Sequence, residues 1–204
     1  RIKPFLNKND SLLDFGCGNG SFLYYAAKAL PECRFFGYEI ASKTEIYRSE
    51  NGALTIVRGD IEVLWKLLPC CHLITMNHTI EHLPKPERTM QELFEKLCSG
   101  GYIEGQTPAA DSFERFLFRN YWSGYHAPRH TVIFSRSGLR SLLSRAGFDK
   151  IRISPAFNPA ACAVSIGSLL HGSNPGEINR RGTWWFLLIC LGAAFAPIDF
   201  FWRA

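Results

Sequence analysis

The sequence predicts an α/β protein with a doubly wound, mostly parallel β-sheet and an apolar helical segment near its C-terminal end. Three observations predict this fold. Short apolar runs alternate with helical patterns between Ser11 and about Ile153, a glycine-rich turn follows the first run, and an acidic residue closes the second and the third. A chain of 204 residues that is 47% hydrophobic and 20% charged is large enough for a full core.

The expected strands are short apolar runs bounded by turn residues. They cover Ser11–Phe15, Arg34–Tyr38, Leu54–Val57, His72–Met76, Gly101–Gln106 and Phe148–Ile153. The clearest helix follows Pro86, because the apolar residues after it repeat at helical spacing and fall on one face: Met90, Leu93, Phe94 and Leu97. We expect further helices over Ser21–Leu30 and Leu139–Ala146.

Charge and cysteine usage restrict the function classes. The net charge is +5 without a basic run, which argues against a nucleic-acid partner and suits an anionic membrane surface. The seven cysteines form no CxxC pair, so we expect neither a disulfide framework nor a zinc ribbon but free thiols in a reducing, cytoplasmic compartment. The chain opens on Arg1 without a signal peptide, and we expect the natural sequence to extend beyond both ends.

The glycine-rich turn follows a buried strand and precedes a helix. Its spacing is Gly-x-Gly-x-Gly, with Ser21 next, so it does not match the G-x-G-x-x-G fingerprint of dinucleotide-binding proteins, which argues against a NAD-dependent oxidoreductase. Glycines permit a tight turn and let a ligand approach the backbone. Asp14 lies just before the glycines, and its carboxylate suits a cationic ligand group rather than a phosphate.

Two more acidic residues stand at the ends of the next two strands. Glu39 is placed to hydrogen-bond ribose hydroxyls, and Asp60 with Ile61 could bind an adenine amino group and pack against its ring. Each carboxylate alone is explained as well by a solvated loop. Three acidic residues at three successive strand ends favour a nucleoside-containing ligand.

These motifs together resemble a known family. The runs LLDFGCGNGSFL, GYEI, GDIE and NHTIEHLPKPERTMQELFEKLCSGGYIEGQTP resemble class I S-adenosylmethionine-dependent methyltransferases, in the small-molecule branch that includes quinone-biosynthesis O-methyltransferases. The resemblance covers about residues 8–153. It implies a Rossmann-like fold of seven strands, the last of them antiparallel, although no such strand is recognisable before Ala204. It also implies S-adenosylmethionine as cofactor, bound by Asp14, Gly16, Cys17, Gly18, Gly20, Glu39, Ile40, Asp60, Ile61 and Asn77.

The acceptor side of the site is expected after the fourth strand. There Glu81 or His82 could orient the acceptor or take its proton, or the pair could simply cap and support the loop. His78, Glu81 and His82 also match the inverted zinc-protease motif, but a strand before them and Pro84 after them leave little room for the helix that this motif needs. We therefore predict no resident metal, although the hard oxygen of Glu81 leaves cation-assisted methyl transfer open.

An aromatic and histidine-rich stretch, residues 107–134, interrupts the helix and strand pattern. Stretches of this length are often lids or binding loops. His126 and His130 are candidate bases for a hydroxyl acceptor, and Arg129 could pair with an acidic acceptor group. The alternative is a loop fixed by aromatic packing, with its histidines on the surface.

The C-terminal segment is predicted to associate with a membrane. Trp184–Ile198 is a run of 15 uncharged residues with arginines and tryptophans at its borders, too short for an ordinary spanning helix. We expect an interfacial or re-entrant hairpin with Asn158–Leu170, so that residues 158–203 hold the protein at the cytoplasmic face of a membrane. A buried core helix or a dimer-interface helix is the alternative.

The combined prediction has two domains. Residues 1–155 form the S-adenosylmethionine-binding methyltransferase domain, with 107–134 as its acceptor-side insertion, and residues 156–204 form the apolar hairpin. We expect methyl transfer to a small or lipid-linked acceptor, at oxygen rather than nitrogen. The sulfonium is already a strong methyl donor, so the protein has mainly to align the reactants and remove a proton. The alternative function is a non-catalytic, membrane-associated module that binds S-adenosylmethionine.

Overall fold

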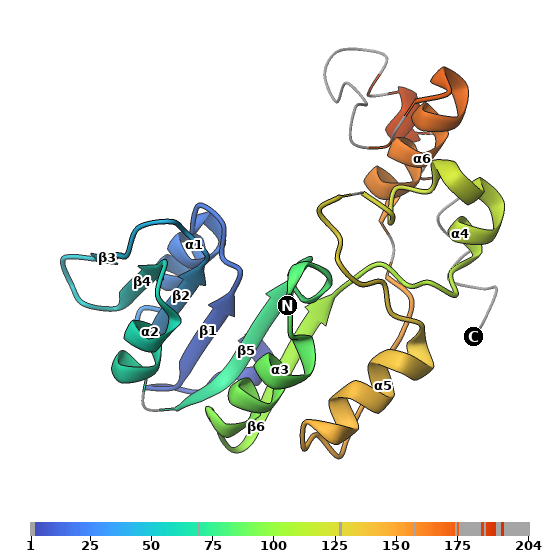
Figure 1. Ribbon diagram of the computed structural model, residues 1–204. Helices are drawn as coiled ribbons and strands as arrows, with labels where there is room; N and C mark the ends of the chain where they lie inside the picture. The colour runs from blue at the N-terminus through green and yellow to red at the C-terminus, as the bar shows by residue number, and fades with distance from the viewer. Residues whose placement is uncertain are drawn as a thin grey trace. The chain divides into compact units, whose positions relative to one another are not determined.

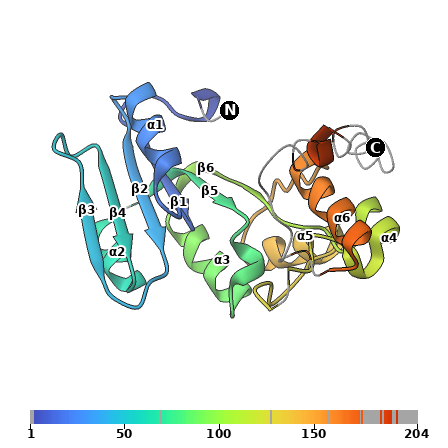
Figure 2. The same cartoon turned by 90° about the horizontal axis from the view of Figure 1, so that it is seen from above.

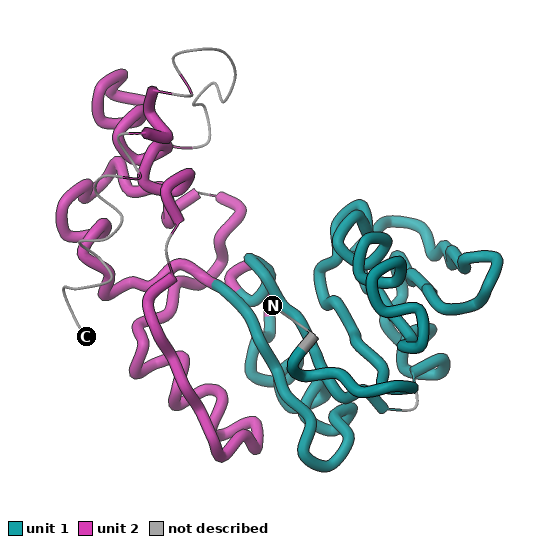
Figure 3. Tube along the Cα trace, turned by 180° about the vertical axis from the view of Figure 1, so that it is seen from behind, with its two compact units in different colours: residues 1–80, 85–106 teal, residues 81–84, 107–204 magenta. Residues whose placement is uncertain are grey.

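The computed structural model describes residues 3–68, 70–126, 128–156 and 158–173, with 175, 185, 187–190 and 193. These residues form two compact units (Figure 3): unit 1 comprises residues 1–80 and 85–106, and unit 2 comprises residues 81–84 and 107–204. The unit boundary differs from the predicted domain boundary near residue 155, because the aromatic insertion and the helix after it belong to one unit.

Unit 1 is built on a six-stranded sheet with the order β3-β4-β2-β1-β5-β6 (Figure 1). Only β3 runs antiparallel to its neighbour, β4. The strands are β1 (Ser11–Phe15), β2 (Arg34–Glu39), β3 (Glu45–Arg48), β4 (Leu54–Arg58), β5 (Cys71–Asn77) and β6 (Leu97–Gln106). The mostly parallel sheet confirms the doubly wound α/β part of the predicted fold class.

The helices of unit 1 cover both faces of this sheet. Figure 2 shows α1 (Ser21–Ala29) on one side and α2 (Ile61–Leu67) and α3 (Pro86–Glu95) on the other. The chain builds the sheet outward from β1 in one direction through α1 and then in the opposite direction through α2 and α3. Right-handed crossovers place helices on opposite faces when the direction reverses, which is the doubly wound arrangement.

The centre of the sheet is the core of unit 1. All five residues of β1 are buried, and Leu12 and Leu13 are fully so. A strand covered by helices on both faces needs apolar residues on both sides, which explains the continuous run Ser11–Phe15. Burying one leucine side chain contributes about 1.5–3 kcal/mol. The central strands therefore form a rigid base for the loops at their carboxyl ends.

Two predictions about elements were wrong. Residues 148–153, predicted as a strand, lie outside any strand, although Phe148 and Ile153 are apolar. The structure adds β3, whose four residues are all exposed and therefore carry no burial pattern that a sequence would reveal. The helix after Pro86 also ends at Glu95, so that Leu97 begins β6 instead of extending the helical face.

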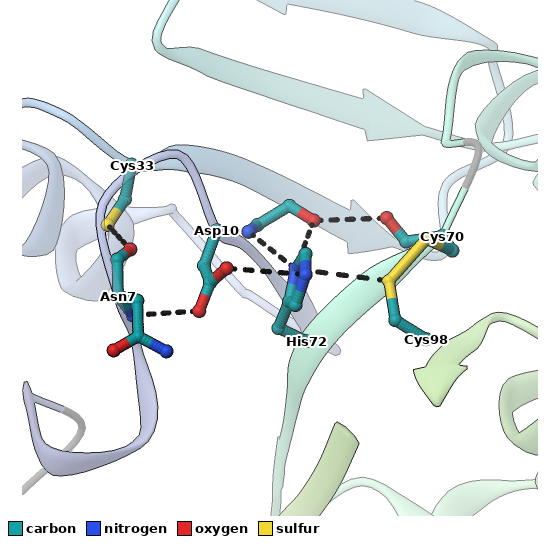
Figure 4. Close-up of polar contacts among 7 residues, drawn as sticks. Asn7, Asp10, Cys33, Cys70, His72 and Cys98 are labelled. Atoms are coloured by element: carbon teal, nitrogen blue, oxygen red, sulfur yellow. Dashed lines mark hydrogen bonds and ion pairs between the residues drawn. A yellow bond between two sulfur atoms is a disulfide. The ribbon is translucent and has the colours of Figure 1, made fainter. Parts of the chain in front are cut away.

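The amino-terminal end of the sheet carries a disulfide between Cys70 and Cys98 (Figure 4), which corrects the expectation of free thiols throughout. Beside it, the backbone N–H of Ser11 donates to His72 Nδ1 at 3.2 Å. The proton of the neutral ring is then on Nε2, which lies 3.3 Å from Asp10 Oδ1. The other five cysteines form no disulfide within the described residues: Cys17, Cys33, Cys71, Cys162 and Cys190.

Unit 2 is helical. Its elements are α4 (Phe113–Phe118), the 3-10 turn η3 (Arg119–Tyr121), α5 (Arg136–Arg145) and α6 (Pro159–His171). Phe118, Trp122 and Cys162 form its buried cluster, and the backbone N–H of Ser123 donates to Ser165 Oγ at 2.9 Å. Helix α6 is thus a core helix of unit 2 along much of its length, which favours the core-helix alternative for residues 158–170.

The rest of the predicted membrane segment lies largely outside the described residues. Of the run Trp184–Ile198, the structure describes residues 185, 187–190 and 193, and Leu188 is buried. Among the described helices, none is both long enough and apolar enough to cross a membrane.

Candidate functional site

The glycine loop joins β1 to α1 and adopts a conformation that suits glycine. Gly16, Gly18 and Gly20 have φ angles of 86°, 56° and 81°, in the left-handed region. The loop is fixed to the neighbouring strand, because the backbone N–H groups of Gly16 and Cys17 both donate to the carbonyl oxygen of Tyr38, at 2.8 and 2.9 Å. Gly20 is the N-cap residue of α1. The loop is therefore a rigid turn rather than a loose connection.

The three glycines differ in what surrounds them. A Cβ at Gly16 would collide with the side chain of Thr79, and one at Gly20 would meet Ile56. Close packing thus explains these two glycines without any ligand. A Cβ at Gly18 would have no protein atom within 4 Å among the described residues. Gly18 is the position where the backbone is open to a ligand.

Asp14 is a buried carboxylate within β1, with 6% of its surface exposed. Its Oδ1 accepts a hydrogen bond from Thr75 Oγ1, on the adjacent strand β5, at 2.7 Å. Burial raises the pKa of the Asp14 carboxyl, the Thr75 hydrogen bond opposes this, and the charge of Glu39 raises the pKa further. A cationic group bound next to Asp14 would stabilise its charged form.

Glu39 ends β2 and lies against the glycine loop. Its Oε2 accepts from the backbone N–H of Gly18 at 2.6 Å, and its Oε1 accepts from that of Ile40 at 3.1 Å. The guanidinium of Arg58 donates to the carbonyl oxygen of Gly18 at 2.8 Å. Glu39 and Arg58 thus bind opposite ends of the same loop residue, a role for Arg58 that the sequence analysis missed.

Asp60 follows β4 and caps α2. Its carboxylate accepts from the backbone N–H of Glu62 at 3.0 Å, and its own N–H donates to Thr44 Oγ1 at 3.2 Å. This capping role explains an aspartate at this position without a ligand. Ile61 is half-buried as the first residue of α2, and the side chain of Ile40 is 78% exposed.

Cys17 and Asn77 complete the predicted cofactor residues. The Cys17 side chain packs toward Gly37, where an added Cβ would lie 2.9 Å from its sulfur. Burial, together with the charges of Asp14 and Glu39, raises the pKa of the Cys17 thiol to about 12, so the thiol stays neutral. Cys17 can therefore contact a ligand through its backbone but not as a thiolate. Asn77 is the exposed last residue of β5.

The predicted cofactor residues share one location in the sheet. Strand β1 pairs with β2 on one side and with β5 on the other, where the direction of winding reverses. Ligands of open α/β sheets bind at this switch point, outside the carboxyl ends of the strands. Asp14, the glycine loop, Glu39 and Asn77 all lie within or just after the carboxyl-terminal halves of β1, β2 and β5.

The acceptor-side candidates come together in unit 2, although they are far apart in the sequence. The rings of His82 and His130 are 4.7 Å apart between centroids, and those of His126 and His130 are 5.3 Å apart. His130 Nε2 lies 4.0 Å from Glu81 Oε1. The segment after β5 and the aromatic insertion, recognised separately in the sequence, thus supply one cluster, Glu81, His82, His126 and His130.

The insertion is fixed to the backbone of Glu81. Thr131 donates to the carbonyl oxygen of Glu81 from its N–H at 2.8 Å and from Oγ1 at 3.1 Å. The Glu81 side chain is fully buried, and its Oε2 accepts from Thr107 Oγ1 at 2.9 Å. Thr107 and Thr131 were not recognised from the sequence, because a threonine beside a loop carries no distinctive spacing.

Two other sequence interpretations change with the geometry. Arg129 is exposed, and its carbonyl oxygen accepts from His82 Nδ1 at 2.8 Å, so its backbone takes part in the cluster. His78 has a φ of 52° and lies outside the 3-10 turn η2 (Ile80–His82). No helix therefore carries His78, Glu81 and His82 together, as the inverted zinc-protease motif requires.

Comparisons with known proteins bear on the family and the fold of this chain. A family model described as a methyltransferase domain matches residues 1–153. Among solved structures, the chain is similar to a SAM-dependent methyltransferase from Archaeoglobus fulgidus, with a TM-score of 0.56 and 23% identity over 76% of this chain and 67% of that one. Among curated protein sequences, none matches the chain.

Two further structures share the fold. A methyltransferase of calicheamicin biosynthesis, in its SAH-bound form, has a TM-score of 0.55 and 13% identity over 75% of this chain and 48% of that one. An O-methyltransferase family 2 protein from Planctomyces limnophilus, in complex with apigenin, has a TM-score of 0.51 and 16% identity over 74% and 48%. The chain thus spans about half the length of these two proteins.

Proposed function

Because the chain belongs to the methyltransferase domain family, whose model matches residues 1–153, we propose that it methylates an oxygen of a small or lipid-linked acceptor. The enzyme is a methyltransferase, and S-adenosylmethionine is its cofactor. The single observation that carries the proposal is the glycine loop at the switch point of the sheet, with Gly18 open and Glu39 bound to its N–H.

The residues of unit 1 fit this cofactor. Gly18 leaves room for a ligand against the backbone, and the buried Asp14 carboxylate would be stabilised by an ammonium group. Glu39 would exchange its hydrogen bond with Gly18 for ribose hydroxyls. The adenine would be bound by Asp60 and covered by Ile61 and Ile40. The rest of the cofactor site would be lined by Gly16, Cys17, Gly20 and Asn77.

The cofactor supplies an electrophilic methyl group on a sulfonium. The residues of this chain have to align a hydroxyl with that methyl and remove its proton. The new O–CH3 bond forms as the S–CH3 bond breaks, and the hydroxyl proton passes to a basic side chain. A histidine suits this task at neutral pH.

His126 and His130 are the proposed bases, with His82 and Glu81 as positioning groups or as bases in their place. The buried Glu81 carboxylate faces His130 Nε2 and would stabilise the protonated imidazole. Support for an oxygen acceptor comes from the resemblance to quinone-biosynthesis O-methyltransferases and from the structural neighbour in complex with apigenin.

A lipid-linked acceptor and a position at the cytoplasmic face of a membrane are part of the proposal. Their support is the apolar run of residues 184–198 with its flanking arginines and tryptophans. Cell fractionation tests this, because deletion of residues 184–203, which leaves the core helix α6 in place, should release a membrane-bound chain. An intact chain that stays in solution and binds no liposomes would refute the membrane part.

The enzymatic activity can be tested without knowing the acceptor. The folded chain is incubated with methyl-labelled cofactor and with lipid or metabolite extracts, and label is traced into products. Glu39→Ala and His130→Ala should both reduce incorporation, the first through cofactor affinity and the second at saturating cofactor. A chain that binds the cofactor but labels no extract would favour the non-catalytic binding module.

A further inference from the structure

The cluster in unit 2 has a donor set that the proposed proton transfer does not fully use. One ligand atom each from Glu81, His82 and His130 lies within 4.8 Å of the other two. We propose that these three residues bind one divalent first-row transition-metal ion, of which zinc is the best fit. This inference departs from our sequence prediction of no resident metal.

The two histidines are oriented as metal ligands are. His130 Nδ1 lies 2.6 Å from the carbonyl oxygen of Gly124, and His82 Nδ1 lies 2.8 Å from that of Arg129. A carbonyl oxygen can only accept, so each Nδ1 carries the proton. In the neutral rings both Nε2 atoms then carry a lone pair. Metal-bound histidines are typically held in this way, with the second ring nitrogen donating to a carbonyl or carboxylate.

The carboxylate of Glu81 is oriented as well. Thr107 Oγ1 donates to Oε2 at 2.9 Å, and Oε1 is the oxygen that faces His130 Nε2 at 4.0 Å. The Glu81 side chain is fully buried, and the His130 side chain is 7% exposed. A bound cation would stabilise a carboxylate that has been removed from water. His82 is exposed, so an ion can reach the cluster from solvent.

The composition of the set selects the class of ion. Two imidazole nitrogens and one carboxylate suit zinc or iron, whereas magnesium and calcium prefer oxygen ligands alone. Zinc–nitrogen distances of about 2.0–2.1 Å place tetrahedral ligand atoms about 3.3 Å apart. Because these atoms are now up to 4.8 Å apart, each separation would shorten by at most about 1.5 Å when the ion binds.

Three protein ligands leave at least one coordination position for another group. This geometry is typical of catalytic rather than structural zinc. If the proposed function holds, that position would take the oxygen of the acceptor, and the ion would lower the pKa of its hydroxyl. Because the Nε2 lone pair of His130 would then be bound to the ion, the hydroxyl proton would pass to His126 instead. The acceptors expected are therefore those with a metal-binding oxygen, such as a phenol or a hydroxy acid.

The test uses Co2+ and Zn2+ alone, with the folded chain and no acceptor. Titration with Co2+ should give saturable binding of one ion per chain with a visible absorption band, and Zn2+ should displace it. His82→Ala, His130→Ala and Glu81→Gln should each lose the band. His171→Ala, an exposed histidine of the same unit, should keep it. Thr107→Val should weaken binding by about 10–100-fold, as loss of an outer-shell partner does.

Circular dichroism and S-adenosylmethionine binding show which variants remain folded. If substitution of Glu81 or His130 unfolds the chain, the exposed His82 still allows the test through His82→Ala. The inference is overturned if the folded wild type binds no Co2+ or if His82→Ala binds it equally well. A chain that transfers methyl groups but takes up no metal rejects the inference and leaves the proposed function intact. A chain that binds Co2+ through these residues but transfers no methyl supports the metal site alone.

Discussion

Glu39 accepts a hydrogen bond from the backbone N–H of Gly18 at 2.6 Å, across 21 residues of sequence. This contact joins the acidic end of β2 directly to the glycine loop after β1. The same carboxylate therefore lies beside the position that a ligand on the loop would occupy.

Glu39→Ala is expected to weaken S-adenosylmethionine binding. Loss of a charged hydrogen-bond partner costs roughly 1–3 kcal/mol, which corresponds to about 5–150-fold in the dissociation constant. Calorimetry measures this, with Glu45→Ala in the exposed strand β3 as control. NAD should bind neither protein. A folded wild-type chain without affinity for S-adenosylmethionine would contradict the cofactor assignment.

Gly18→Ala should separate ligand binding from backbone strain when it is compared with Gly52→Ala. Both glycines have a positive φ, 56° and 69°, and an added Cβ meets no described atom within 4 Å at either. Each substitution should therefore cost a similar ~1–2 kcal/mol of stability, measured by denaturant unfolding. Only Gly18→Ala should also weaken the binding of S-adenosylmethionine. Equal cofactor affinity in the two variants would mean that the ligand does not approach Gly18.

Asp14 should make the protein less stable as the pH rises. The carboxyl has a pKa above its usual value of 3.8 in the folded state, mainly through burial, so the folded chain holds the proton more tightly than the unfolded chain. Stability is then fully present below pH 3.8 and falls as the pH rises through the folded-state pKa. Asp14→Asn removes this dependence and still lets Thr75 donate its hydrogen bond.

The measurement for Asp14 is the free energy of unfolding of both proteins as a function of pH. The stability of Asp14→Asn relative to the wild type should increase from about pH 4 upward. A difference that is constant or that decreases with pH would show that burial does not control this group. The variant should also bind S-adenosylmethionine more weakly, because the proposed partner of the cofactor's ammonium group has lost its charge.

His126→Ala and His130→Ala should reduce turnover without weakening the binding of S-adenosylmethionine. Removing a general base lowers the rate by about 10²–10⁴-fold, whereas the cofactor candidates belong to unit 1 and both histidines to unit 2. Once an acceptor is known, kcat and the cofactor dissociation constant are measured together, with His171→Ala as control. Wild-type turnover in both variants would transfer the role of base to His82 or Glu81.

Much of unit 1 was predictable because its signals are local. The apolar run Ser11–Phe15, the glycines after it and Glu39 at the end of the next strand each lie within a short stretch of sequence. The glycine conformations were predictable in the same way, since glycine is the residue type that adopts a left-handed turn at the least cost. Strand β3 was not predicted because its side chains are all exposed. Phe148–Ile153 was wrongly predicted as a strand, because an apolar run becomes a strand only when another strand pairs with it.

The acceptor-side cluster was predictable only in its parts. A hydrogen bond between His82 and Arg129 connects the two segments, although these residues are 47 positions apart. Neither segment carries a sequence signal that predicts this contact. The same holds for Thr107, which looks like an ordinary loop residue until it is seen to donate to Glu81. The disulfide was missed for a related reason, because pairing depends on the register of β5 and β6 rather than on cysteine spacing.

The bond between Cys70 and Cys98 turns the stretch between them into a closed covalent ring. That ring contains Glu81, His82 and all of α3. A protease that nicks the backbone anywhere inside it leaves both fragments in one molecule until a reductant opens the bridge. Two of the three proposed metal ligands would thus stay tethered to the sheet even in a chain that has been cut.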